Sequence, residues 1–80
     1  MKIREAVVLR IINLCHKKGI TINKLSKEAG ISHSTLNNII SSRQINPTIN
    51  TVQKICDGLE IKIKDFYNDV IFETIEQEIE

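Results

Sequence analysis

The chain has 80 residues, of which 41% are apolar, with a single Pro and no Trp. This length allows one compact domain with a small core, and the composition excludes an intrinsically disordered segment or a coiled rod. No run approaches the roughly 20 apolar residues that span a bilayer. The first apolar run does not have the form of a signal peptide, because Arg10 and Asn13 interrupt it. We therefore expect a cytoplasmic protein without a membrane partner.

The net charge of +1 conceals a difference between the two ends of the chain. Residues 1–64 contain all eleven Lys and Arg and four acids, a net charge of +7, whereas residues 65–80 contain six acids and no base, a net charge of −6. A basic body suits the phosphate backbone of a nucleic acid, which would repel the acidic segment. The alternative is a solvated helix face with an accidental bias, and we favour the functional division.

Cysteine and histidine are too few for a metal site or a disulfide framework. Cys15 and Cys56 each lie among apolar residues at helical spacing and are interpreted as small buried hydrophobic side chains. His16 and His33 form no paired spacing that would preorganise a tetrahedral metal shell. The sequence also lacks a Gly-rich phosphate loop and a nucleophile with a partnering base, so we expect no metal, no cofactor and no enzymatic activity.

The spacing of apolar residues predicts a first helix over residues 3–16, and Gly19, preceded by two lysines, predicts its end. Apolar residues cover more of the circumference of this helix than one contact face needs. Leu9 and Ile12 therefore require a further cover. Either residues 70–79 fold back on the helix or a second copy of the chain covers it, and the sequence leaves both arrangements open.

Residues 21–43 predict two short helices joined by a tight turn. Thr21 and Ser32 suit the N-cap positions, where a side-chain oxygen satisfies a backbone N–H at the start of a helix. Gly30 and Ile31 form the turn between the helices. The residues expected to face inward are Leu25 and Ala29 from the first of these helices, and Leu36, Ile39 and Ile40 from the second. This spacing is that of a helix-turn-helix.

The outward face of the second of these helices, over residues 32–40, is short and polar. It carries His33, Ser34, Asn37 and Asn38, whose side chains donate and accept hydrogen bonds as reading of base edges in a DNA major groove requires. Asn38 can bind adenine through a paired donor and acceptor, a contact that contributes about 1–3 kcal/mol of base discrimination. Such residues are often merely solvated, but two adjacent asparagines are poor helix formers and favour a role. DNA binding is the leading hypothesis.

The remainder of the chain predicts a loop and two further helices. Residues 41–47 have no helical period and end in Asn-Pro, which indicates a loop. Thr48 suits the N-cap of a fourth helix that ends near Gly58. The residues expected to face inward from it are Ile49, Val52, Ile55, Cys56 and Leu59. A fifth helical element begins near Ile63, and its apolar spacing continues almost to the carboxyl terminus with a break expected near residues 68–69, so the fold is all-α.

These features resemble the phage-repressor-like helix-turn-helix family of the Xre and Cro type. The resemblance covers nearly all of residues 1–67, including the first helix ending at Gly19, the turn at residues 30–32 and the loop closing at Pro47. It implies a five-helix lambda-repressor-like domain whose third helix lies in the major groove. An acidic amphipathic extension over residues 68–80 follows this domain.

The resemblance implies base contacts from the start of the third helix, which here are His33, Ser34 and Asn38, with Asn37 as a further contributor. Relatives often carry a phosphate-binding Gln after the cap of the second helix. This chain has Ile22 there, which cannot donate a hydrogen bond from its side chain, so phosphate binding must shift to other residues. The candidates for phosphate contacts are Thr21, Thr35, Arg43, Gln44 and Asn46.

A second departure concerns an ion pair. Relatives often carry an Arg at the position of Cys15 and a Glu at the position of Ile40. Because loss of both partners leaves no unpaired buried charge, we expect apolar repacking, with the two side chains close together and Ile40 out of solvent.

The sequence therefore predicts a sequence-specific regulator of transcription that binds double-stranded DNA, and of repression and activation we expect repression. We expect a homodimer whose two headpieces face half-sites about 34 Å apart. One alternative is a helix-turn-helix antitoxin that binds a protein toxin through residues 65–80 and represses its own promoter. Another is a module that binds only protein, and retention of such a module on random duplex DNA would not depend on the salt concentration.

Overall fold

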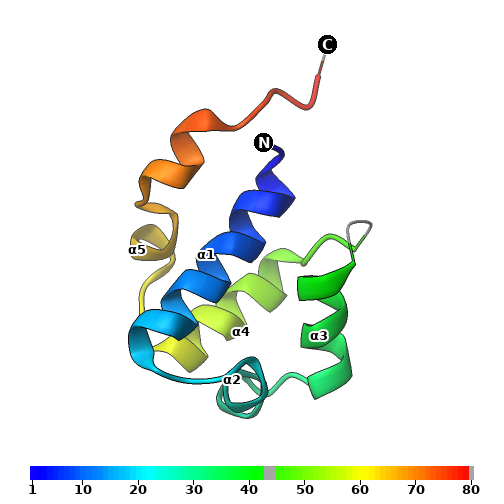
Figure 1. Cartoon of the computed structure of the whole chain (residues 1–80), viewed down its shortest axis with the longest axis vertical. Helices are drawn as coiled ribbons and strands as arrows, with labels where there is room; N and C mark the ends of the chain where they lie inside the picture. The colour runs from blue at the N-terminus through cyan, green and yellow to red at the C-terminus, as the bar shows by residue number, and fades with distance from the viewer. Residues whose placement is uncertain (43–44, 80) are drawn as a thin grey trace.

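The computed structural model describes residues 1–42 and 45–79, and every regular element within these residues is a helix (Figure 1). The α-helices are α1 (Ile3–Lys18), α2 (Ile22–Ala29), α3 (His33–Ser41), α4 (Ile49–Leu59) and α5 (Ile63–Tyr67), and the short 3₁₀ helix η1 (Val70–Thr74) follows them. The prediction of an all-α fold with five helices is confirmed.

Most helix boundaries follow from local caps. The hydroxyl oxygens of Thr21, Ser32 and Thr48 accept hydrogen bonds of 3.0, 3.1 and 3.1 Å from the backbone N–H three residues further along the chain. Gly19 and Gly30 end α1 and α2 in the left-handed conformation, each with φ of 68°, which glycine adopts without a steric penalty. All five residues act as the sequence predicts.

The carboxyl end of α4 lies within one residue of the predicted position. The helix continues through Gly58 to Leu59, and the left-handed residue that follows it is Glu60, with φ of 58°. Gly58 lies against α2, where an added Cβ would be 2.9 Å from the backbone nitrogen of Ala29. The glycine is therefore needed for the close approach of α2 and α4, the most extensive helix pairing in the described part of the chain.

The core lies where the five helices meet. Its largest fully buried apolar side chains are Phe66, Ile11, Leu25, Leu36, Ile55 and Leu59. The predicted inward faces of α2 and α3 are confirmed, with Ile40 half-buried against the same core. Ile49 is the exception, because this predicted core residue is 87% exposed. As the first residue of α4, it directs its Cβ toward the amino end of the helix and beyond the layer that contains Val52.

Both cysteines are free and buried, as predicted. Burial raises the pKa of the Cys15 and Cys56 thiols, and the neighbouring Asp57 carboxylate adds to the effect at Cys56. Ile40 is half-buried against the core cluster that contains Cys15, and direct contact between these two side chains stays a prediction.

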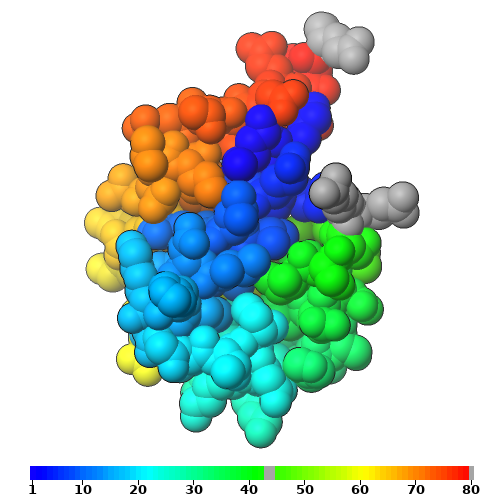
Figure 2. Space-filling model, in the orientation of Figure 1, coloured from blue at the N-terminus to red at the C-terminus, as the bar shows by residue number. Residues whose placement is uncertain are grey.

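The chain after α5 folds back along α1. It breaks at residues 68–69, as predicted, and the Asp69 carboxylate then accepts a hydrogen bond of 2.9 Å from the Ile71 backbone N–H at the start of η1. Phe72 packs against the core. In Figure 2 the blue surface of α1 separates this orange segment from green α3. Of the two covers left open for α1, the C-terminal segment therefore supplies at least part, although Leu9 and Ile12 each remain 39% exposed.

The expected helical continuation toward the carboxyl terminus is wrong for residues 75–79, which form no helix. Val70 is 71% exposed and Ile79 is 82% exposed, so the apolar residues of this segment form no continuous buried stripe. A short helix needs such packing to be stable, since its nucleation is unfavourable.

Arg10 is a buried member of the apolar face of α1, which sequence analysis treated only as an interruption. Its side chain donates hydrogen bonds of 2.7 Å to the Phe66 carbonyl, 2.9 Å to the Asp65 carbonyl and 3.0 Å to the Asp69 carboxylate. The guanidinium thus ties α1 to the carboxyl end of α5 and to the start of η1. A charge buried in this way is satisfied by charge-assisted bonds.

Candidate DNA-binding surface

The helix pair α2 and α3 holds one helix edge in a fixed position at the surface. Leu36 and Ile39 anchor α3 in the core with exposed fractions of 0% and 3%. At its amino end, Ser32 accepts a hydrogen bond from the Thr35 backbone N–H, and its hydroxyl donates to the Thr35 hydroxyl at 2.7 Å. These contacts fix both the rotation and the start of α3, so that its outer face is a rigid edge.

The structure brings the four predicted base-contacting residues together on this outer face. His33, Ser34, Asn37 and Asn38 are all exposed, with His33 and Asn37 one turn apart and Ser34 and Asn38 likewise. Within residues 1–42 and 45–79, the side chains of His33, Asn37 and Asn38 form no hydrogen bond or ion pair. Their donors and acceptors are therefore available to base edges.

A groove of about 270 Å³ lies beside this edge, between α3 and the start of α4. Its lining residues are Thr35, Asn38, Ile39, Ile45, Asn46, Pro47, Thr48 and Thr51. The groove brings two of the predicted phosphate-contacting residues, Thr35 and Asn46, next to Asn38. Thr21 lies apart from them as the exposed N-cap of α2, and Arg43 and Gln44 lie outside the described residues.

Sequence analysis recognised Thr48 only as a cap and did not include Thr51. Both line the groove, and Thr48 accepts a hydrogen bond of 3.1 Å from the Thr51 backbone N–H, with 2.9 Å between the two hydroxyls. The same hydroxyl spacing of three residues occurs at Ser32 and Thr35. This repeated pattern in the sequence indicates a second polar helix start of the same kind, whose free N–H groups suit an anion, but it does not indicate that this start lies beside α3.

The charges around α3 favour contact with DNA. The sequence of α3 contains no acidic residue, so no carboxylate on this helix opposes a phosphate backbone. On α2, Lys24 lies 3.1 Å from Glu28, and both side chains are at least half exposed, which makes this a weak pair. Helix η1, the first part of the acidic C-terminal segment, lies on the α1 and α5 side of the molecule, whereas α3 lies on the other side (Figure 1).

Metal binding and membrane insertion find no support in the part of the chain that the structure describes. In residues 1–42 and 45–79, no group of three or more His, Cys, Asp or Glu side chains could hold a metal ion. No helix in the same residues has the length and apolar character needed to cross a membrane.

The fold and this exposed polar edge define a helix-turn-helix DNA-binding domain. Comparison with known families agrees, because the model of the Cro/C1-type HTH DNA-binding domain matches residues 10–70. The chain belongs to this family, which confirms the resemblance to Xre-type proteins.

Two similar proteins come from Bacillus subtilis (strain 168). The HTH-type transcriptional regulator SlrR is 35% identical over 60 residues, which are 74% of this chain and 40% of SlrR. The SPbeta prophage-derived uncharacterized HTH-type transcriptional regulator YopS is 35% identical over 57 residues, 71% of this chain and 77% of YopS. The match to SlrR thus spans less than half of that relative. No solved structure matches the chain.

Proposed function

We propose that this protein regulates transcription by binding a specific double-stranded DNA sequence, with α3 in the major groove. The observation that carries the proposal is the exposed edge of His33, Ser34, Asn37 and Asn38 on a helix whose opposite face is anchored in the core. Support comes from membership of a DNA-binding family and from two relatives that are named transcriptional regulators.

In this proposal, α3 presents its amino end to the bases. Asn38 binds adenine through its amide oxygen and nitrogen, and His33, Ser34 and Asn37 contribute further hydrogen bonds. The phosphate contacts come from Thr21, Thr35, Arg43, Gln44 and Asn46, together with the hydroxyls of Thr48 and Thr51 in the adjoining groove. The free N–H groups at the start of α2 replace the Gln that Ile22 does not supply.

We further propose that the protein acts in the cytoplasm as a homodimeric repressor. One α3 edge contacts too few base pairs for useful selectivity, and a two-fold dimer doubles the number. Leu9 and Ile12, each 39% exposed on α1, offer apolar surface for such a dimer. The antitoxin alternative gains no specific support, because Asp69 of the acidic segment is already engaged by Arg10 within the chain.

Selection of bound sequences from a random duplex pool tests the proposal. Wild type should enrich a palindrome whose half-sites are about one helical turn apart. Asn38→Ala should lose the preference at one base pair of each half-site, at a cost of about 1–3 kcal/mol. The matched control is Asn13→Ala, which removes an exposed asparagine from α1 and should leave the selected sequence unchanged.

Two results would contradict the proposal. If wild type and Asn38→Ala enrich the same sequences, Asn38 does not read a base. If retention on random duplex DNA is unaffected by salt, the protein makes no phosphate contacts and does not bind DNA, since release of counterions makes such binding weaken steeply as salt rises.

A further inference from the structure

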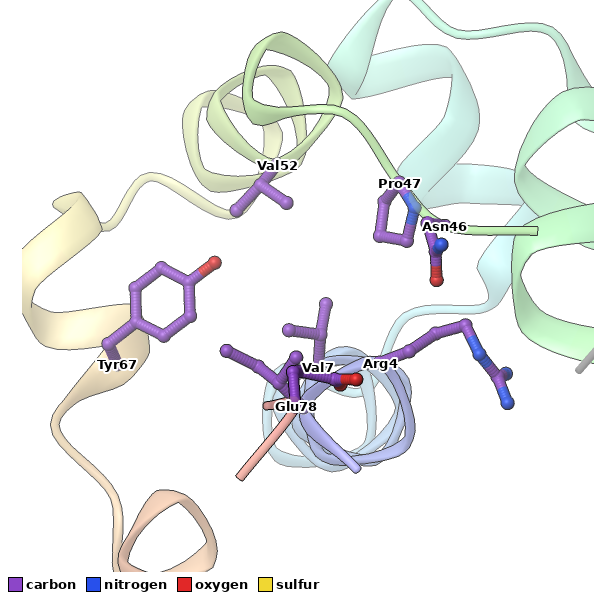
Figure 3. A pocket seen from close by; sticks show the side chains of 8 residues that line it. Arg4, Val7, Asn46, Pro47, Val52, Tyr67 and Glu78 are labelled. Carbon is purple, nitrogen blue, oxygen red and sulfur yellow. The ribbon is translucent and has the colours of Figure 1, made fainter. Parts of the chain in front are cut away.

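A cavity of about 290 Å³ lies among α1, the loop before α4, α4 and α5 (Figure 3). Its lining residues are Ile3, Arg4, Val7, Asn46, Pro47, Val52, Tyr67 and Glu78. Ligand sites in proteins measure about 300–1,000 Å³, so a cavity at the lower end of this range suits only a small molecule.

The middle of the cavity is apolar. Val7 and Val52 are 4% and 6% exposed and form its opposite walls, and Pro47 closes one end (Figure 3). The Tyr67 hydroxyl points into the space from the other end (Figure 3) and makes no hydrogen bond to the part of the chain that the structure describes. Burial, together with the Cys56 thiol, raises the pKa of Tyr67, so that this hydroxyl stays protonated and can donate.

The rim carries two opposite charges that are not paired with each other. Toward the described residues, Arg4 donates a single long hydrogen bond of 3.4 Å, to the Ser42 carbonyl. The Glu78 carboxylate lies 3.8 Å from the Lys2 ammonium group, and both of these side chains are exposed. A part-buried hydrogen bond of 3.4 Å and an exposed ion pair of 3.8 Å are both weak contacts. Both charged groups can therefore turn toward a molecule in the cavity at little cost.

We propose that this cavity binds a free α-amino acid with a branched apolar side chain, of the size of leucine. The carboxylate of the ligand pairs with Arg4, its ammonium group pairs with Glu78, and its side chain lies between Val7 and Val52. A zwitterion with an apolar side chain matches two opposite charges beside an apolar wall, whereas a simple anion would face Glu78 and a simple cation would face Arg4.

Occupation of the cavity would alter DNA binding. Asn46 and Pro47 line both this cavity and the groove beside α3, so a ligand that moves this loop also moves the groove. Any such effect is reciprocal, because DNA must then change the affinity for the amino acid by the same factor. This step alone rests on the proposed function.

The binding test is an NMR titration of the isotope-labelled protein with L-leucine into the millimolar range, without DNA. We expect shifts of the Ile3, Val7 and Val52 methyl signals. The comparison ligands are 3-methylbutylamine and 4-methylpentanoate, which each lack one charged group of leucine. Each should bind about tenfold more weakly than leucine, because it loses one charge-assisted hydrogen bond. Absence of shifts with leucine, or equal binding of all three molecules, would overturn the proposal.

Two variants test the assigned charges. Arg4→Gln should weaken leucine binding about tenfold, whereas the control Lys17→Gln, which removes an exposed cation elsewhere on α1, should not change it. Glu78→Gln replaces an exposed residue that has no part in the core, so it should fold normally and abolish the preference for leucine over 4-methylpentanoate. Unchanged binding in Arg4→Gln, or an unchanged preference in Glu78→Gln, would show that the assignment is wrong.

A final measurement separates the site from the regulation. Affinity for the selected DNA sequence is measured with and without saturating leucine, and we expect a change of at least about fivefold. An unchanged affinity, with leucine binding intact, would refute the coupling and leave the site standing. Failure to bind any DNA, again with leucine binding intact, would refute the proposed function while the cavity assignment holds.

Discussion

Replacement of Gly58 by alanine provides the sharpest test of how the helix-turn-helix is supported. Gly58 lies inside α4, where alanine is ordinarily favoured by about 1 kcal/mol. An added Cβ would lie 2.9 Å from the Ala29 backbone nitrogen and 3.1 Å from its Cα. Real Cβ atoms do not approach backbone so closely, and therefore α2 has to move away from α4.

The two effects have opposite signs, and the steric effect should prevail. Overpacking of a core costs about 1–3 kcal/mol, and here the obstructing atoms belong to a helix backbone that cannot rotate away. After subtraction of the gain in helix propensity, we expect Gly58→Ala to lower the free energy of unfolding by up to about 2 kcal/mol. For a domain of this size each kcal/mol corresponds to roughly 4–8 °C in Tm.

Urea unfolding followed by far-UV circular dichroism measures this change. The control is the double variant Gly58→Ala with Ala29→Gly, which removes the Ala29 side chain but keeps the backbone nitrogen and Cα that lie closest. We expect it to remain destabilised. A stabilising effect of Gly58→Ala, or full recovery in the double variant, would refute the reasoning.

Three further predictions concern other parts of the fold. Arg10→Met should lower the free energy of unfolding by about 2–3 kcal/mol, because it leaves two carbonyls and a partly exposed carboxylate without their hydrogen-bond donor. Asp69→Asn should lower it by only about 1 kcal/mol. Equal losses for the two variants in urea unfolding would contradict this prediction. Glu60→Gly should increase the free energy of unfolding by about 0.5–1 kcal/mol and so raise Tm, because Glu60 has φ of 58°, a left-handed conformation that glycine adopts without a steric penalty. Burial raises the folded-state pKa of both thiols and of Tyr67. The stability that depends on their protonated forms should therefore be fully present at neutral pH and be lost above about pH 9. A free energy of unfolding that does not change between neutral and alkaline pH would exclude this linkage.

The features that sequence reasoning predicted correctly are those set by neighbours in the chain. Thr21 and Ser32 cap helices through the backbone three residues away, and Gly19 ends α1 through its own φ. The outer face of α3 follows from the same local rule, because helical period places Asn38 opposite the buried Leu36 and away from the core.

The features that it did not predict depend on contacts between distant segments. Gly58 served only to mark the approximate end of the fourth helix, but its role is set by Ala29 on another helix. Thr51 joins the candidate site only because the loop before α4 returns beside α3. Sequence spacing carries no direct information on the approach of Gly58 to Ala29 or of Thr51 to α3. The repeated hydroxyl spacing indicates only that α3 and α4 begin in the same way.

Arg10 combines both kinds of information. It occupies a position of the apolar stripe of α1, between Val7 and Leu14, so helical period alone indicates that its guanidinium is buried. A buried cation requires acceptors, and the acidic segment was the place to seek them. Asp69 supplies one at 3.0 Å, and the carbonyls of α5 supply the others.

The same contacts explain how an almost neutral chain can serve an anionic partner. The pair of Arg10 with Asp69 holds this acidic residue on the α1 side of the molecule. The molecule extends over 38 × 24 × 20 Å, several times the Debye length of about 8 Å at physiological salt. A carboxylate acts mainly on charges within one Debye length, and Arg10 holds the Asp69 carboxylate beside α1 and α5. If the segment were released, as by Asp69→Asn with Lys2→Gln, we expect affinity for random duplex DNA at low salt to fall, and unchanged affinity would show that its position has no electrostatic role.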